Sequence, residues 1–184
     1  MSDNIRCFMV INHESGDVLL EYKTETTDRR NYGNEASQKL SQMKADETNF
    51  VPEQTRMGML FVEIGEIDEE HEKLAYLIFV APDYSESAAK QLLNKHARAV
   101  ESMAKDGTFD PAQGVTQTDG AKKAYRAVCK TLASEYESID EVARLVREKP
   151  QEKHEIIEDT KEKRDFLKQV IDFFDEYDRK NPLK

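Results

Sequence analysis

The side chains most often used for chemistry, histidine and cysteine, are few in this chain, and no two of them stand at a metal-binding spacing. The histidines are His13, His71, His96 and His154, and the cysteines are Cys7 and Cys129. A metal site needs ligands at helical or turn spacing, as in Cys-x-x-Cys or His-Glu-x-x-His, and neither pattern occurs. We therefore predict no metal ligands.

Motifs for nucleophilic catalysis and nucleotide binding are missing from the sequence as well. It contains no Gly-x-Ser-x-Gly elbow, no Gly-x-Gly-x-x-Gly turn and no phosphate-binding loop. The carboxylates lie in charged runs such as 66–72, which provide no pocket that would shift a pKa. We predict no catalytic residues, no cofactor and no enzymatic activity. The alternative is a small enzyme with a site assembled from distant residues around His96 or Cys7.

Composition and charge restrict the partners. The 184 residues are 38% hydrophobic and 35% charged, with a net charge of −10. Such an acidic chain is a poor ligand for nucleic acid or for an anionic membrane surface, so protein partners are expected. No apolar run approaches the roughly 18 to 20 residues that span a bilayer, and residues 1–4 do not begin a signal peptide. We expect a cytoplasmic protein with reduced cysteines, which reaches endomembranes only through partners.

Short apolar runs separated by turn residues predict an antiparallel sheet. Ile5–Ile11 and Val18–Tyr22 flank a turn that contains Gly16, which predicts a hairpin. Met57–Glu66 and Leu74–Val80 have the strongest strand composition and a connection suited to antiparallel pairing. Between the two pairs, Pro52 leaves room only for a short edge strand around Phe50 and Val51.

Apolar residues three or four positions apart predict the helices. The first begins near Gly33, with Asn31 or Asn34 as its cap. The second follows Pro82 with a capping box of Asp83 and Glu86 and ends near Gly107. Its expected buried side is Ala89, Leu92, Leu93, Val100 and Met103. A third helix is predicted over 118–148, and Pro150 should end or kink it before a charged helix over 151–178.

These elements define the predicted fold class and domains. The class is α+β, an antiparallel sheet of about five strands flanked by helices, with a C-terminal helical extension. Residues 1–107 form the α+β domain and residues 118–180 form the extension, which is broken near Pro150.

The last turns of the extension are amphipathic, which makes them a candidate docking face. Its residues are Phe166, Val170, Phe173, Phe174 and Tyr177, with Leu167 and Ile171 beside them. An isolated helix of this length is marginal in water and needs a surface to cover its apolar side. The face could pack on its own domain, or it could bind a partner or a second copy. Exchange between the two would make it a switch.

The order of these elements resembles that of the longin domain, a profilin-like α+β fold found in certain SNARE proteins and trafficking subunits. The matching segments are Ile5–Ile11, Val18–Tyr22, Asn31–Gly33, Met59–Val62 and Ala75–Tyr84. Ala81 and Asp83 resemble the small residue and the acid that follow the last strand of the family. The resemblance covers a little over half of the chain.

What the resemblance implies is a protein-binding platform used in vesicle trafficking and protein transport. The family commonly binds a peptide or helix, often its own tail, in a groove between the first helix and the middle strand. Mapped by position, this groove consists of Tyr32, Ala36, Leu40, Met43, Met57, Met59 and Phe61. The implied partners are a SNARE-like helix, a trafficking subunit or a small GTPase, and the tail face is the natural occupant.

The extension departs from the coiled-coil motif that follows a longin domain in SNAREs. Residues 139–142 and 156–161 are similar to such a motif, but Pro150 and a polar stretch interrupt the heptads, and no membrane anchor follows. We therefore expect an adaptor and not a fusogenic SNARE. The alternative is a profilin- or roadblock-like module that binds a cytoskeletal protein or a small GTPase.

Overall fold

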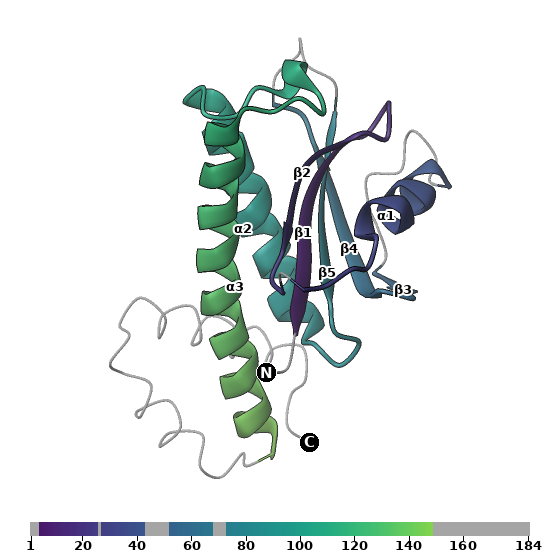
Figure 1. Ribbon diagram of the computed structural model, residues 1–184. Coiled ribbons are helices and arrows are strands. Elements are labelled where there is room, and N and C mark those ends of the chain that lie inside the picture. Colours follow the sequence, from purple (N-terminus) through teal and green to yellow (C-terminus); the bar gives the residue numbers. More distant parts are fainter. Residues whose placement is uncertain (1–3, 26, 43–51, 68–72, 149–184) are drawn as a thin grey trace.

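The computed structural model describes residues 4–25, 27–42, 52–67 and 73–148, with side chains of the last helix up to Ile139. One five-stranded antiparallel sheet has helix α1 on one face and helices α2 and α3 on the other (Figure 1). In chain order the elements are β1 (Ile5–Asn12), β2 (Val18–Lys23), α1 (Tyr32–Ser41), β3 (Glu53–Thr55), β4 (Gly58–Gly65), β5 (Leu74–Val80), α2 (Glu86–Lys105), a 3-10 turn (Pro111–Gln113) and α3 (Asp119–Glu148). The predicted α+β class, with a sheet of about five strands, is confirmed.

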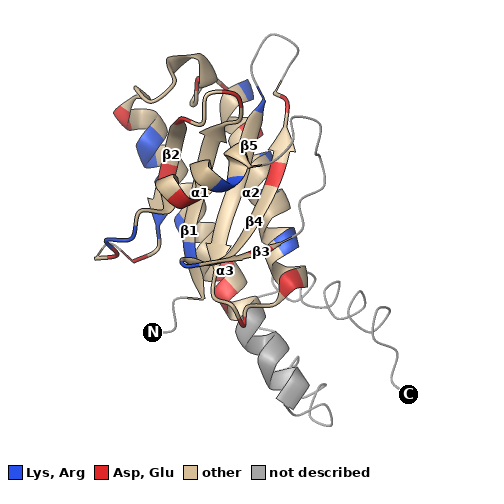
Figure 2. Ribbon diagram, turned by 90° about the vertical axis from the view of Figure 1, so that its right-hand side faces the viewer, with Lys and Arg blue, Asp and Glu red and all other residues tan. Residues whose placement is uncertain are grey.

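The strand order β2-β1-β5-β4-β3 places the most apolar strand, β5, at the centre of the sheet. Every residue from Leu74 to Val80 is buried, because β1 and β4 pair with its two sides and a helical layer covers each face. This explains why every residue of β5 is apolar and buried, while the edge strands β2 and β3 keep exposed residues. Figure 2 shows that charged residues lie mainly on the helices and loops around this sheet.

The first hairpin forms as predicted and contains one additional residue. β1 pairs antiparallel with β2, and the register shifts so that Val10 is opposite Leu20 while Ile11 is opposite Val18. Leu19 is the unpaired residue of this bulge, and Leu19 and Leu20 are both buried in the cluster beneath α2 and α3. A bulge is the arrangement that lets two neighbouring residues face one side of a sheet.

A second bulge near the start of β1 fixes the turn between β3 and β4. Ile5 is opposite Val80 and Cys7 is opposite Phe79, so Arg6 is the additional residue. The Arg6 Nη1 atom donates to the Met57 carbonyl at 2.7 Å. Gly58 follows with φ +126°, and a β-carbon built there would lie 2.2 Å from the Val80 carbonyl oxygen. Only glycine allows the two backbones to approach this closely.

The short edge strand is offset from the predicted position. β3 is Glu53–Thr55, and it pairs with β4 from Leu60 to Gly58. Pro52 has no N–H to donate, so the pairing begins after it. Phe50 and Val51, which were expected to form this strand, lie outside the described residues.

Of the two predicted helix caps, one is confirmed and one is wrong. Asn31 caps α1 as expected, since its Oδ1 accepts from the Asn34 N–H at 3.0 Å. The predicted capping box of Asp83 and Glu86 is wrong, because the N-cap of α2 is Ser85. A turn in which the Tyr84 N–H donates to the Ala81 carbonyl at 3.0 Å delays the start of the helix by two residues. The predicted buried side of α2 is confirmed in all five positions.

Helix α3 contributes to the same hydrophobic core as the sheet. Tyr125, Cys129 and Tyr136 belong to the cluster that contains Phe8 of β1 and Leu92 of α2. The predicted boundary at residues 107–118 therefore does not coincide with a gap in packing, and the division into two domains stays a prediction. Pro150, the charged helix over 151–178 and the tail docking face lie outside the described residues.

The close approach at Gly58 predicts a large loss of stability for Gly58→Ala. The added methyl group would collide with the Val80 carbonyl, and the positive φ would be strained, so we expect at least about 2 kcal/mol less free energy of unfolding in a urea titration. Gly107→Ala is the matched control. Gly107 also has a positive φ, +80°, but nothing lies within 4 Å of its β-carbon position, so about 1 kcal/mol is expected. Equal losses in the two variants would contradict the proposed contact.

Candidate functional site

His96 is the most deeply buried polar side chain in the described residues, and its surroundings make it a core residue. It is fully buried, and its Nε2 atom is 2.9 Å from the Tyr125 hydroxyl. The rings of Phe8, Tyr76 and Tyr125 lie around it at centroid distances of 5.3, 6.2 and 5.7 Å. Burial lowers the pKa of His96 to about 3, so the imidazole is neutral in ordinary buffers.

The two cysteines are buried on opposite faces of the sheet. Cys7 lies in the cluster beneath α1, and Cys129 lies in the cluster beneath α2 and α3. Burial raises the pKa of both thiols well above the ordinary value. The thiolate is the reactive form of cysteine, so neither thiol is available as a nucleophile in this state. His96 and Cys7, around which the small-enzyme alternative would assemble a site, are both fully buried.

The groove mapped from the longin resemblance is only partly assembled. Tyr32, Ala36 and Leu40 are the buried residues of α1 and pack against the sheet, with Met57 half-buried at the margin of that cluster. Met59 and Phe61 instead pack on the opposite face, in the cluster beneath α2 and α3. Their assignment to the groove is wrong, because side chains alternate along β4. The residues that β4 presents to the α1 side are Leu60, Val62 and Ile64.

Two further groups of the predicted site lie outside the described residues. They are Met43 at the end of the mapped groove, and the tail face of Phe166, Val170, Phe173, Phe174 and Tyr177. The occupancy of the groove by the tail stays a prediction.

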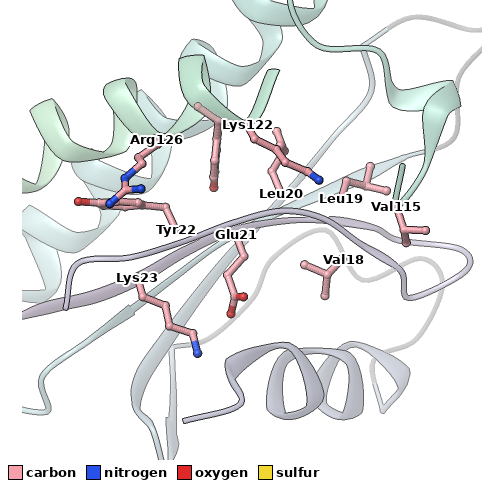
Figure 3. Close-up of a pocket in the computed structure, with 10 residues that line it drawn as sticks. Val18, Leu19, Leu20, Glu21, Tyr22, Lys23, Val115, Lys122 and Arg126 are labelled. Atoms are coloured by element: carbon pink, nitrogen blue, oxygen red, sulfur yellow. The ribbon is translucent and has the colours of Figure 1, made fainter. Parts of the chain in front are cut away.

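A cavity of about 510 Å³ lies elsewhere, between the edge of β2 and helix α3 (Figure 3). Its lining residues are Val18, Leu19, Leu20, Glu21, Tyr22, Lys23, Val115, Lys122, Tyr125 and Arg126. Sequence reasoning assigned β2 and α3 to structure alone and did not anticipate a site between them. We name this region the β2-edge site.

The backbone of β2 is open on the side of this cavity, because β2 is the first strand of the sheet. The Thr24 N–H donates to the Arg6 carbonyl at 3.1 Å, and antiparallel pairs alternate between bonded and non-bonded. Tyr22 with Phe8 and Leu20 with Val10 are therefore the bonded pairs. It follows that Glu21 and Lys23 direct their N–H and C=O groups away from β1.

The two faces of the β2-edge site carry different charges (Figure 3). On the side of α3, Arg126 lies above Tyr22 and Lys122 lies further along the helix, near Leu20. The Arg126 charge opposes the rise that burial causes in the Tyr22 pKa. Glu21 and Lys23 lie on the α1 side. The rim of the site includes Val115, which is 59% exposed and is the exposed large hydrophobic residue of the described part.

A polar cluster fixes the chain that leaves β2. The Asp28 carboxylate accepts hydrogen bonds from Arg30 Nε at 2.8 Å and from the Tyr32 hydroxyl at 2.6 Å. These bonds, that from Arg30 foremost, hold the pKa of Asp28 well below its ordinary value. Lys23 Nζ donates to the Arg30 carbonyl at 2.6 Å and the Asp28 carbonyl at 3.3 Å. The ammonium group of Lys23 is thus already occupied.

Two comparisons with known proteins identify no family for this chain. A scan against protein-family models matches no family, and a search of curated proteins finds no relative. In the described part of the chain, no helix is both long and apolar enough to cross a membrane. In the same residues, no three histidine, cysteine, aspartate or glutamate side chains come together as metal ligands.

The buried state of His96 predicts a specific pH dependence of stability. Its pKa is lower in the folded protein than in the unfolded chain, where it is about 6.5, so the unfolded state binds more protons in acid. The contribution of His96 to stability is fully present above pH 6.5, and it falls as the pH is lowered from there toward 3. Between pH 6 and pH 5 the loss from this residue should be about 1 kcal/mol.

The measurement is urea unfolding of the wild type and of His96→Gln across that pH range. Glutamine keeps a polar group near Tyr125 but does not titrate, and the other three histidines are present in both proteins. The wild type should therefore lose stability more steeply than the variant. Parallel curves would show that His96 is not buried as a neutral imidazole.

Proposed function

We propose that this chain is a non-enzymatic protein-interaction module, a longin-like adaptor for vesicle trafficking or regulation, and that it binds a partner at the β2-edge site. The observation that carries the proposal is an open strand edge beside a cavity of about 510 Å³. The order of elements from β1 to α2 is the order on which the longin resemblance rests, and this supports the adaptor role.

An unpaired strand edge is a surface that binds other chains. Its free N–H and C=O groups can pair with an extended segment of a partner, and side-chain pockets beside the edge supply selectivity. At the other end of the sheet, β3 has only three residues and directly follows Pro52, so it offers a much shorter edge. β2 is six residues long and borders the cavity, which makes it the stronger candidate.

The chemistry of the interior is consistent with a binding role. The buried imidazole is neutral and the buried thiols are protonated, as their shifted pKa values indicate. Reactivity would require these groups in a pocket that a substrate can enter, and the β2-edge site is lined by neither His96 nor a cysteine. The lining instead combines backbone, aliphatic and cationic groups, which suits recognition of a polypeptide.

The proposal predicts that a partner can be captured from the rim of the site. A photo-crosslinking amino acid at Val115 should give discrete protein adducts on illumination in cells, because the side chain is exposed next to the cavity. The same amino acid at Arg98, exposed on α2 and outside the cavity lining, is the control. Identical adduct patterns at the two positions, or none from position 115, would contradict the proposed function.

A further inference from the structure

We propose that the β2-edge site binds an extended peptide with an acidic residue at every second position, which adds to the sheet as a sixth strand next to β2. This inference rests on the proposed function and specifies the chemistry of the partner. Three features of the site support it: its free backbone groups, the placement of its cations, and the mismatch that a second copy of the chain would create.

The free backbone groups set the register of the added strand. Glu21 and Lys23 each present one N–H donor and one C=O acceptor to the open side, as the alternation from the Thr24–Arg6 bond requires. A peptide residue opposite each of them could exchange hydrogen bonds without disturbing β1. Main-chain pairing of this kind supplies affinity but little selectivity. The side chains around the edge must therefore provide the selectivity.

The lining that α3 contributes to the site carries two positive charges. Lys122 and Arg126 line the cavity, are exposed, and take part in no ion pair among the described residues. The carboxylate of Glu21 lies on the opposite face of the sheet (Figure 3). The remaining cation of the lining, Lys23, already donates to two carbonyl groups. Lys122 and Arg126 are therefore the two cations available to a ligand.

This positive face is unusual for the protein that carries it. The chain has a net charge of −10, yet residues 119–133 contain four cations and one carboxylate. An acidic peptide is repelled by most of an acidic protein, so a local positive surface selects where it can bind. The charge is thus complementary to an acidic ligand at the place where the strand edge is open.

The spacing of the acidic residues follows from strand geometry. Successive side chains of an added strand point to opposite faces, so only alternate positions can reach Lys122 and Arg126. The other positions face Glu21 and Lys23, where a second acidic residue would meet the Glu21 carboxylate. Uncharged β-branched residues are favoured there, because they suit a pleated surface.

A second copy of the chain fits this edge less well. Antiparallel pairing of two β2 strands about a two-fold axis brings the same surface of each copy together. Lys122 and Arg126 of one copy would then face the same two cations of the other, and like charges across an interface disfavour association. The exposed cations thus favour an acidic partner over self-association.

The test is binding of an acetylated eight-residue peptide in which glutamate alternates with valine, measured by calorimetry and by amide exchange on the full chain. We expect binding that weakens as ionic strength rises, together with slower exchange of the Glu21 and Lys23 amides. The same peptide with lysine in place of glutamate should not bind. The acidic peptide with alternate amides methylated should not bind either, because it cannot pair with β2.

Two matched double variants test the cations. Lys122→Glu with Arg126→Glu should weaken binding of the acidic peptide by about ten-fold or more. Lys123→Glu with Lys130→Glu makes the same change in net charge on the same helix, but neither residue lines the cavity, so the affinity should change less than about three-fold. Unfolding curves establish that both variants are folded, since all four positions are exposed.

A backbone variant separates strand addition from simple charge attraction. Glu21→Pro removes an outward N–H that β1 does not use, so the protein should stay folded and lose the peptide. Equal effects of the two charge variants, or binding without protection of the Glu21 and Lys23 amides, would overturn the inference. Concentration-dependent protection of these amides without peptide would show a second copy as the occupant. If crosslinks form from Val115 while the peptide fails to bind, the adaptor role stands and only the acidic-strand partner is wrong.

Discussion

The structure depends on a single constraint, the complete burial of β5. A strand that is apolar on both faces must have a neighbour on each side and a covering layer on each face, since exposed backbone groups and exposed apolar surface are both unfavourable. β1 and β4 provide the neighbours. Tyr32 of α1 packs with Phe79 on one face at a centroid distance of 5.0 Å, while α2 and α3 close the other face. With β1 and β4 beside β5, β2 and β3 form the two edges of the sheet.

The same constraint separates the buried titratable side chains from the charged side chains that a ligand can reach. Groups that point into the two cores lose contact with water, and their pKa values shift in the direction that favours the neutral form. Burial lowers the pKa of His96 and raises that of Cys129. Groups on the margin of the sheet stay in contact with water, and Lys122 and Arg126 at the β2-edge site form no ion pair with another described residue. The binding site that we propose accordingly lies where the layers end, between β2 and α3.

The elements were predictable from the sequence because their signals are local. Short apolar runs bounded by turn residues identified the four long strands, and apolar residues three or four positions apart identified the helices α1, α2 and α3 within a few residues. The site was not predictable, because its features depend on long-range pairing. Met59 and Phe61 were assigned to the wrong face since the parity of β4 relative to α1 is set by the sheet. The edge status of β2 likewise depends on strand order, and Lys122 and Arg126 resemble any solvated helix residues until β2 is placed beneath them.

The two bulges give the sheet an uneven tolerance to changes in length. β2 and β1 each contain one residue more than their partner can match, at Leu19 and Arg6. A single deletion near Leu19 can be absorbed by closing the bulge, which removes one core side chain but leaves the pairing on either side intact. The ladder between β4 and β5 contains no bulge that could absorb a deletion, because its register is continuous from Met59 opposite Val80 to Gly65 opposite Leu74. A deletion there would exchange the two faces of the strand beyond it. Homologous chains can therefore differ in length along the first hairpin, while the central pair must keep its residue count.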